Sequence, residues 1–140
     1  MRDLERERAA DALAAVERVR GQAEEVQKNY RSYVDRFGGA VVMNGLGQAL
    51  ATELAAAESV KATDESSESK ADKVAHRMLA DSVSSFLSRD GGVYPRATDV
   101  MKAIVSSDQA VYLRAQAEVL AWLTWHKKFC HAYLPRGSND

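Results

Sequence analysis

The sequence predicts an all-α protein, a single-domain bundle of about five helices in which the first and the last helix are the longest. Three observations favour this fold class. Apolar residues recur at helical spacing along most of the 140 residues, alanine is abundant, and alternating runs of Val, Ile and Thr are absent. A chain of this length is expected to form one domain around one hydrophobic core.

The first predicted helix runs from Asp3 to about Arg36. Its apolar residues form two series with a period of seven, which is typical of a long helix packed lengthwise in a bundle. Gly21 allows a bend in this helix, and a homodimeric coiled coil is the alternative interpretation of the same pattern. The two series are Ala9, Val16, Ala23, Tyr30 and Phe37, and Ala12, Val19, Val26 and Tyr33.

Phe37-Gly38-Gly39 is expected to stop that helix, and a second helix is predicted from Ala40 to about Ala57. Asn44 and Gln48 lie one turn apart inside it, with two glycines between them. The glycines indicate either close approach of the first helix or a site at which the two amides contact a partner. The face expected to be buried consists of Val42, Leu46, Ala49, Leu50 and Leu54.

Residues 58–69 have almost nothing apolar to bury, and we expect an acidic, solvated loop there within the single domain of residues 1–140. Ser69 is predicted to cap a third, amphipathic helix over residues 70–88. Thr98 is predicted to cap a short fourth helix over residues 99–105.

The last predicted helix, Asp108 to Leu134, is the central element of the fold. Asp108 can cap its first turn, and Pro135 ends it. Residues 119–123 are apolar on every side, so this helix is expected to be surrounded by other helices. Its core-facing stripe is predicted to be Trp122, His126, Phe129 and Tyr133.

The formal net charge of −1 hides an uneven distribution. Residues 58–72 hold five acidic and two basic residues, so the rest of the chain has a net charge of +2 and can present a basic patch. The N-terminus lacks the apolar core of a secretory signal, and no stretch approaches the roughly 20 apolar residues of a membrane span. With a single cysteine as well, we expect a cytoplasmic protein that contacts no membrane.

No group of residues with a catalytic pattern is found. The chain has no phosphate-binding loop, no His-Glu-x-x-His motif, no Gly-x-Ser-x-Gly elbow and no Cys-x-x-Cys pair. His126, Cys130 and His131 are neighbours on the last helix, but a fourth metal ligand is missing, and nothing in the sequence activates Cys130 as a nucleophile. We therefore expect no metal, no cofactor and no catalytic residues, and an enzyme that uses His126 and Cys130 is the remotest alternative.

The strongest candidates for function are basic side chains on the first and last helices, which could face one groove. Such cations can neutralise phosphates, and Trp125 beside two lysines is suited to stack on a base. Lysines at a helix end also complement the helix dipole, which is the structural alternative. Asn44 and Gln48 are candidates for polar contacts to RNA or to a neighbouring subunit. The basic candidates are Lys28, Arg31, Arg36, Arg114, Lys127 and Lys128.

Three segments in these regions carry a resemblance to a known family. They are Lys28-Asn29-Tyr30-Arg31-Ser32-Tyr33, Asn44-Gly45-Leu46-Gly47-Gln48-Ala49-Leu50-Ala51, and the segment from Glu118 to Phe129 with its two tryptophans and Lys127-Lys128. In order and spacing, over most of the chain, they resemble the small helical subunit of type III-B CRISPR effector complexes, called Cmr complexes. Thr52-Glu53 departs from the family, which is usually apolar at that point.

The resemblance implies a non-catalytic, all-helical subunit of an antiviral ribonucleoprotein. Such subunits stack beside the backbone subunits, and beside copies of themselves, along the channel in which guide RNA pairs with target RNA. The expected partners are therefore other Cmr subunits, further copies of the chain, and guide or target RNA. The rival interpretation is a helical protein-interaction adaptor without direct nucleic-acid contact.

Overall fold

The computed structural model describes residues 2–58 and 66–137, and within them it contains six α-helices and no strand. The predicted all-α class is confirmed, with six helices in place of about five. The helices are α1 (Leu4–Arg20), α2 (Glu24–Asn44), α3 (Leu46–Glu58), α4 (Ser67–Ser88), α5 (Val100–Ser106) and α6 (Gln109–Tyr133).

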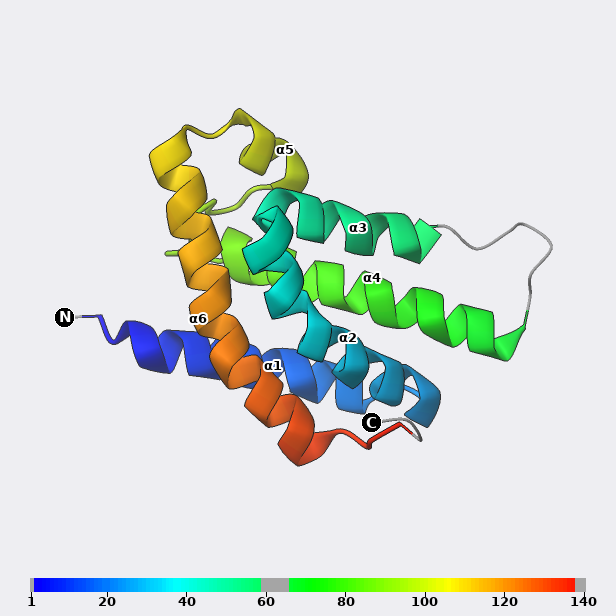
Figure 1. Cartoon of the computed structure of the whole chain (residues 1–140). Coiled ribbons are helices and arrows are strands. Elements are labelled where there is room, and N and C mark those ends of the chain that lie inside the picture. The colour runs from blue at the N-terminus through cyan, green and yellow to red at the C-terminus, as the bar shows by residue number, and fades with distance from the viewer. Residues whose placement is uncertain (1, 59–65, 138–140) are drawn as a thin grey trace.

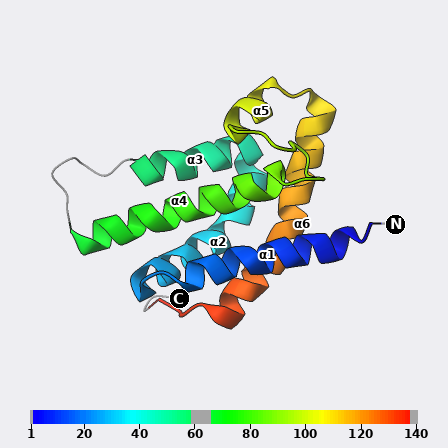
Figure 2. The ribbon, with the colours of Figure 1, turned by 180° about the vertical axis from the view of Figure 1, so that it is seen from behind.

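Helix α6 crosses the bundle and contacts most of the other helices. In Figure 1, α1 passes behind α6, α2 lies beside it, and α3 and α4 run side by side away from it. The reverse view in Figure 2 shows α1 and α4 in front of α2, with the short α5 closing the end at which α3 and α6 begin. The prediction that the last helix is the central element, surrounded by other helices, is wrong: α6 packs across one face of the bundle, and α4 is the helix that contacts the other five.

A stacked pair of α6 side chains, Trp122 and His126, lies at the centre of the core. Both are fully buried, with ring centroids 4.2 Å apart, and Trp122 also stacks on Phe86 of α4 at 5.6 Å. The predicted core-facing stripe is correct for Trp122 and His126, which are buried. It does not extend to Tyr133, which is 46% exposed. Tyr133 lies in the last turn of α6, beyond the core, where the Arg20 guanidinium covers its ring at 5.3 Å.

The prediction of one helix from Asp3 to Arg36 is wrong, because the chain turns at residues 21–23. The amides of Gly21 and Gln22 bond back to Arg18 and Val19, which closes α1, and Ala23 is extended and starts α2. Ala23 occupies a heptad position but is exposed. The turn lets α1 and α2 contact α6 on two different sides, which one straight helix could not do.

The predicted stop at Phe37-Gly38-Gly39 is also wrong, and α2 continues to Asn44. Val34, Phe37 and Val41 are buried on one face of α2, so their packing outweighs the helix-breaking tendency of the two glycines. The actual break is Gly45, whose φ of 89° lies in the region that glycine adopts at little cost.

The later helices begin close to the predicted residues, with small shifts of their caps. Helix α4 is capped by Ser66 in place of Ser69, and α5 by Asp99 in place of Thr98, while Asp108 caps α6 as predicted. Each of these side chains accepts a hydrogen bond from a backbone amide three residues ahead. Of the expected acidic loop, Glu58 and residues 67–69 are helical, and residues 59–65 lie outside the described residues.

Candidate nucleic-acid interface

Helices α2 and α6 pack antiparallel and form one continuous side of the bundle. Near the start of α2, Arg31 Nη1 donates to the carbonyl oxygen of Leu134 at 3.1 Å, and Asp35 lies 2.7 Å from His131 Nε2. At the other end of the pair, the Leu46 amide donates to Gln116 Oε1 at 3.0 Å. The start of α2 is therefore held against the end of α6.

Four of the six predicted cations lie on this antiparallel pair, near the end that contains Leu134. Lys28 precedes Arg31 by one turn of α2, and Lys127 precedes His131, the partner of Asp35, by one turn of α6. Lys128 is the next residue and projects from the solvent side of α6. We call these four side chains the basic wall: Lys28, Arg31, Lys127 and Lys128.

The four side chains of the basic wall differ in solvent exposure and in their contacts with other residues of the chain. Lys127 and Lys128 are exposed, and neither forms an ion pair within the described part of the chain. Lys28 pairs with Glu24 at 3.4 Å across an exposed turn, a contact that is worth little in water. Arg31 is half-buried, and its bond to Leu134 commits part of its guanidinium to the fold.

The other two predicted cations, Arg36 and Arg114, lie on different sides of the molecule. Arg36 covers the ring of Tyr33 at 5.0 Å, and Tyr33 stacks on His76 of α4 at 3.9 Å, so Arg36 lies on the α4 side of α2. Arg114 lines a cavity of about 550 Å³ together with Arg2 and Glu118, on the side of α6 that α1 covers. The structure therefore does not unite all six cations on one face.

Trp125 does not join the two lysines that follow it. Its ring stacks on Phe129 at 5.9 Å, and Nε1 donates to Glu5 Oε2 of α1 at 3.2 Å. The half-buried indole therefore packs toward α1, away from the α2 side of α6. The expectation that Trp125 stacks on a base beside Lys127 and Lys128 has no support in this arrangement.

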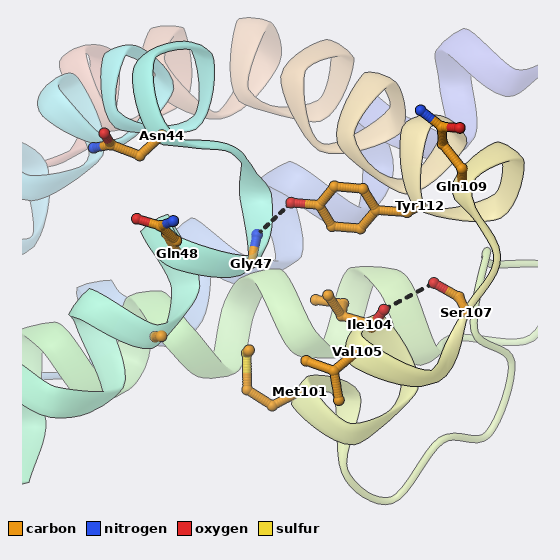
Figure 3. Close-up of a pocket in the computed structure, with 10 residues that line it drawn as sticks. Asn44, Gly47, Gln48, Met101, Ile104, Val105, Ser107, Gln109 and Tyr112 are labelled. Atoms are coloured by element: carbon orange, nitrogen blue, oxygen red, sulfur yellow. Dashed lines mark hydrogen bonds between the residues drawn. The ribbon is translucent and has the colours of Figure 1, made fainter.

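Asn44 and Gln48 lie in a groove of about 710 Å³ at the opposite end of the α2–α6 pair. Asn44 ends α2 and Gln48 belongs to the first turn of α3, so they flank the Gly45 break and do not share one helix. Figure 3 shows Asn44 and Gln48 on one side of the groove and Met101 and Val105 of α5 on the other, with the two amide groups turned away from α5. Tyr112 Oη accepts a hydrogen bond from the Gly47 amide at 2.9 Å, which holds the first turn of α3 against α6.

His126 and Cys130, the two residues of the enzymatic alternative, are buried in the hydrophobic core. His126 Nδ1 bonds to the Ala12 carbonyl at 3.0 Å and Nε2 lies 2.6 Å from the Tyr30 hydroxyl, so both ring nitrogens have partners. Burial lowers the pKa of His126 to about 4 and raises the pKa of the Cys130 thiol to about 12, so the imidazole is neutral and the thiol protonated at pH 7. Within the described residues, no three His, Cys, Asp or Glu side chains are close enough to hold a metal ion.

The environments of Glu53 and Val42 differ from what their positions in the sequence suggest. Glu53 of α3 is buried and bonds to His76 of α4, a pairing between separate helices that no spacing rule could indicate. Val42 was predicted in the core but is 69% exposed, because the helix that contains it ends at Asn44. A pattern of apolar spacing assigns a face only when the helix boundaries are known.

Residues 4–133 match the family model of the CRISPR-associated protein Cas_Cmr5. The match covers all six helices and both ends of the α2–α6 pair. In the described part of the chain, no helix combines the length and the apolar character that crossing a membrane would require.

Proposed function

The chain belongs to the Cas_Cmr5 family and is a subunit of a CRISPR Cmr complex, and we propose that within this complex it holds RNA along the basic wall without acting on it chemically. Guide RNA and target RNA present the same anionic phosphate groups, so the proposed contact applies to either strand. The proposal also covers self-stacking beside the backbone subunits and a role in antiviral defence, which the family resemblance implies. It includes a cytoplasmic location, which the single cysteine favours.

The charge distribution along the second half of α6 is the main support for the proposed RNA contact. Residues 119–134, the last four turns of α6, contain Lys127, Lys128 and His131 and no acidic residue. On the α2 side of this stretch Asp35 is paired with His131, and on the α1 side Glu5 and Asp11 accept hydrogen bonds from the indoles of Trp125 and Trp122. Two unpaired, exposed lysines beside Arg31 and Lys28 form a local positive surface on a chain whose net charge is −1.

The chemistry of the site supports binding without catalysis. A phosphate contact requires only a cation within reach, and lysine supplies one with three freely rotating donors. The buried, neutral His126 and the protonated Cys130 thiol offer no accessible nucleophile or base next to the basic wall. Because one copy contributes only a few phosphate contacts, the isolated subunit is expected to bind RNA weakly, and the assembled complex to bind it more tightly.

The test compares Cmr complexes reconstituted with the wild-type chain or with the double variant Lys127→Ala, Lys128→Ala. RNA affinity is measured over a series of salt concentrations. The steepness of log K against log salt should decrease by about 1.4 for each copy of the subunit that contacts the RNA, because each phosphate contact with a single strand contributes about 0.7. Lys102→Ala is the control, since Lys102 is an exposed lysine of α5, outside the basic wall.

An unchanged slope in a complex that contains the double variant at full occupancy would contradict RNA contact by the basic wall. It would favour the adaptor, a subunit that binds other proteins only. The Lys102→Ala control should leave the slope at its wild-type value.

A further inference from the structure

Asn44 differs from the other two asparagines of the sequence in the residue that follows it. Asn29 is followed by a tyrosine and Asn139 by an aspartate, whereas Asn44 is followed by Gly45. Glycine has no side chain to shield its backbone nitrogen, and its wide range of backbone angles allows that nitrogen to approach the preceding side chain. An asparagine before a glycine is therefore the arrangement in which the backbone attacks the side-chain amide most readily.

The Asn44 side chain is open to solvent. Asn44 is the last residue of α2 and lines the groove beside α3, and Figure 3 shows its amide group turned away from α5. Within the residues that the structure describes, this amide forms no hydrogen bond that would hold it in place. Its amide carbon, Cγ, is therefore accessible to water and free to rotate toward the backbone.

The last turn of α2 has few buried contacts. Val41 is buried, but the side chains of Val42 and Met43 are 69% and 81% exposed, and Asn44 follows them on the surface. One backbone bond protects the Gly45 nitrogen, whose N–H donates to the Val41 carbonyl oxygen at 2.8 Å. Turns with exposed backbone bonds and few apolar contacts open locally at a small free-energy cost. We therefore expect this bond to break and re-form while the rest of the chain stays folded.

We propose that Asn44 is a site of spontaneous deamidation, with the Gly45 nitrogen as the nucleophile. When the last turn of α2 opens, this nitrogen loses its proton to hydroxide and attacks Asn44 Cγ. The new C–N bond closes a succinimide ring, and the side-chain nitrogen takes up a proton from water and leaves as ammonia.

Water completes the reaction by opening the succinimide ring. Cleavage of the bond between the Gly45 nitrogen and Cγ leaves an aspartyl residue at position 44. Cleavage of the bond between the same nitrogen and the backbone carbonyl carbon leaves an isoaspartyl residue, in which the chain runs through Cγ. The net change is the loss of ammonia and the gain of water, so the reaction needs no oxidant, reductant or other protein.

Both products disturb the connection between α2 and α3. Each places a negative charge at the C-terminal end of α2, where the helix dipole disfavours it, in a groove whose lining residues carry no charge. The isoaspartyl product also lengthens the backbone by a methylene just before Leu46 and Gly47. Their amides donate to Gln116 and Tyr112 at 3.0 and 2.9 Å, and these bonds depend on the spacing of the chain. We therefore expect the modified chain to have a lower thermal midpoint.

The test follows the full-length chain during incubation at neutral and at alkaline pH. After digestion, mass spectrometry measures the replacement of an amide by a carboxyl group in the peptide that contains Asn44, and chromatography separates the aspartyl from the isoaspartyl form. We expect both forms to accumulate, and faster at alkaline pH, because the Gly45 nitrogen must lose its proton. Asn29, inside α2 and followed by a bulky residue, should stay unmodified.

The matched control is Asn44→Gln, which keeps the amide but lengthens the side chain, so that the succinimide ring cannot form. At this exposed position the variant should fold as the wild type does and lose the modification at position 44 completely. The wild-type chain unfolded in urea at the same pH gives the rate without the protecting bond. An unmodified Asn44 in the folded chain, after a time in which the unfolded chain is converted, would overturn the proposal because the bond to Val41 would then lock the site. Conversion of Asn29 at the same rate would also overturn it, since the reaction would then require global unfolding. Neither outcome bears on RNA binding, which the salt series tests separately.

Discussion

His126 connects four helices through one imidazole ring. Its Nδ1 bonds to Ala12 of α1, and its Nε2 lies 2.6 Å from the Tyr30 hydroxyl of α2, which in turn is 3.0 Å from Ser82 Oγ of α4. The Nδ1 contact with a carbonyl requires a proton on Nδ1, so the neutral ring presents Nε2 as an acceptor to Tyr30. The spacing of residues along α6 predicted that His126 faces the core. It could not predict these partners, which come from three other helices.

Acid should destabilise the fold through His126. Burial lowers the pKa of His126 from 6.5 to about 4, so between these values the unfolded chain binds a proton that the folded chain does not. Stability contributed by the neutral ring is therefore complete above the unfolded pKa and is lost as the pH falls through this window. Between pH 7 and pH 5 we expect the free energy of unfolding to decrease by about 2 kcal/mol from this residue.

Urea denaturation at both pH values, in the wild type and in His126→Phe, measures this effect. The variant will be less stable at both pH values because Tyr30 loses its partner, but its own decrease between pH 7 and pH 5 should be smaller by about the same 2 kcal/mol. His131→Phe, at an exposed position, is the comparison. Equal pH dependence in the wild type and in His126→Phe would refute the assignment.

At the scale of the helix, the sequence predicts what is determined locally and misses what is determined by contact. Asp108 and the apolar run that follows define α6, because a cap and a periodic stripe act over a few residues. The end of α2 depends on contacts of Gly45 and Gly47 with Tyr112, more than 60 residues away. For this reason the sequence predicts a stop at Gly38-Gly39 and places Asn44 and Gln48 on one helix, although they belong to two.

The two kinds of glycine should respond to alanine with opposite signs. In Gly45→Ala, a Cβ would sit at a φ of 89° and only 3.1 Å from the Tyr112 hydroxyl, so we expect a loss of about 1–2 kcal/mol in the free energy of unfolding. In Gly39→Ala, a Cβ on helix α2 would meet nothing within 4 Å, and we expect a gain of about 0.5–1 kcal/mol. Thermal and urea denaturation of both variants, against the wild type, measure the difference. A destabilised Gly39→Ala would indicate that α2 does not continue through this position.

At the scale of the whole molecule, the α2–α6 pair separates two kinds of surface. The basic wall lies where α2 begins and α6 ends, and the exposed apolar residues Val42, Met43 and Leu113 lie where α2 ends and α6 begins. The candidate cations can be identified from the sequence, but the face on which each one lies cannot. That face depends on the turn at residues 21–23 and on the contacts of α2 with other helices. Antiparallel packing thus places the proposed RNA-binding surface at one end of the α2–α6 pair.

Single substitutions that remove one positive charge at different places test whether RNA follows one wall. Lys28→Gln, Arg36→Gln and Arg114→Gln each change the net charge equally, so any long-range electrostatic effect on RNA is similar for the three. Only Lys28 belongs to the basic wall. In reconstituted Cmr complexes we therefore expect Lys28→Gln to reduce the salt slope of RNA binding by about 0.7 for each copy that contacts the RNA, and the two arginine variants to leave it unchanged. An equal decrease in Arg36→Gln would move the RNA path to the side of α2 that faces α4, and one in Arg114→Gln would move it to the α1 side of α6; either result would overturn the single wall while preserving an RNA-binding subunit.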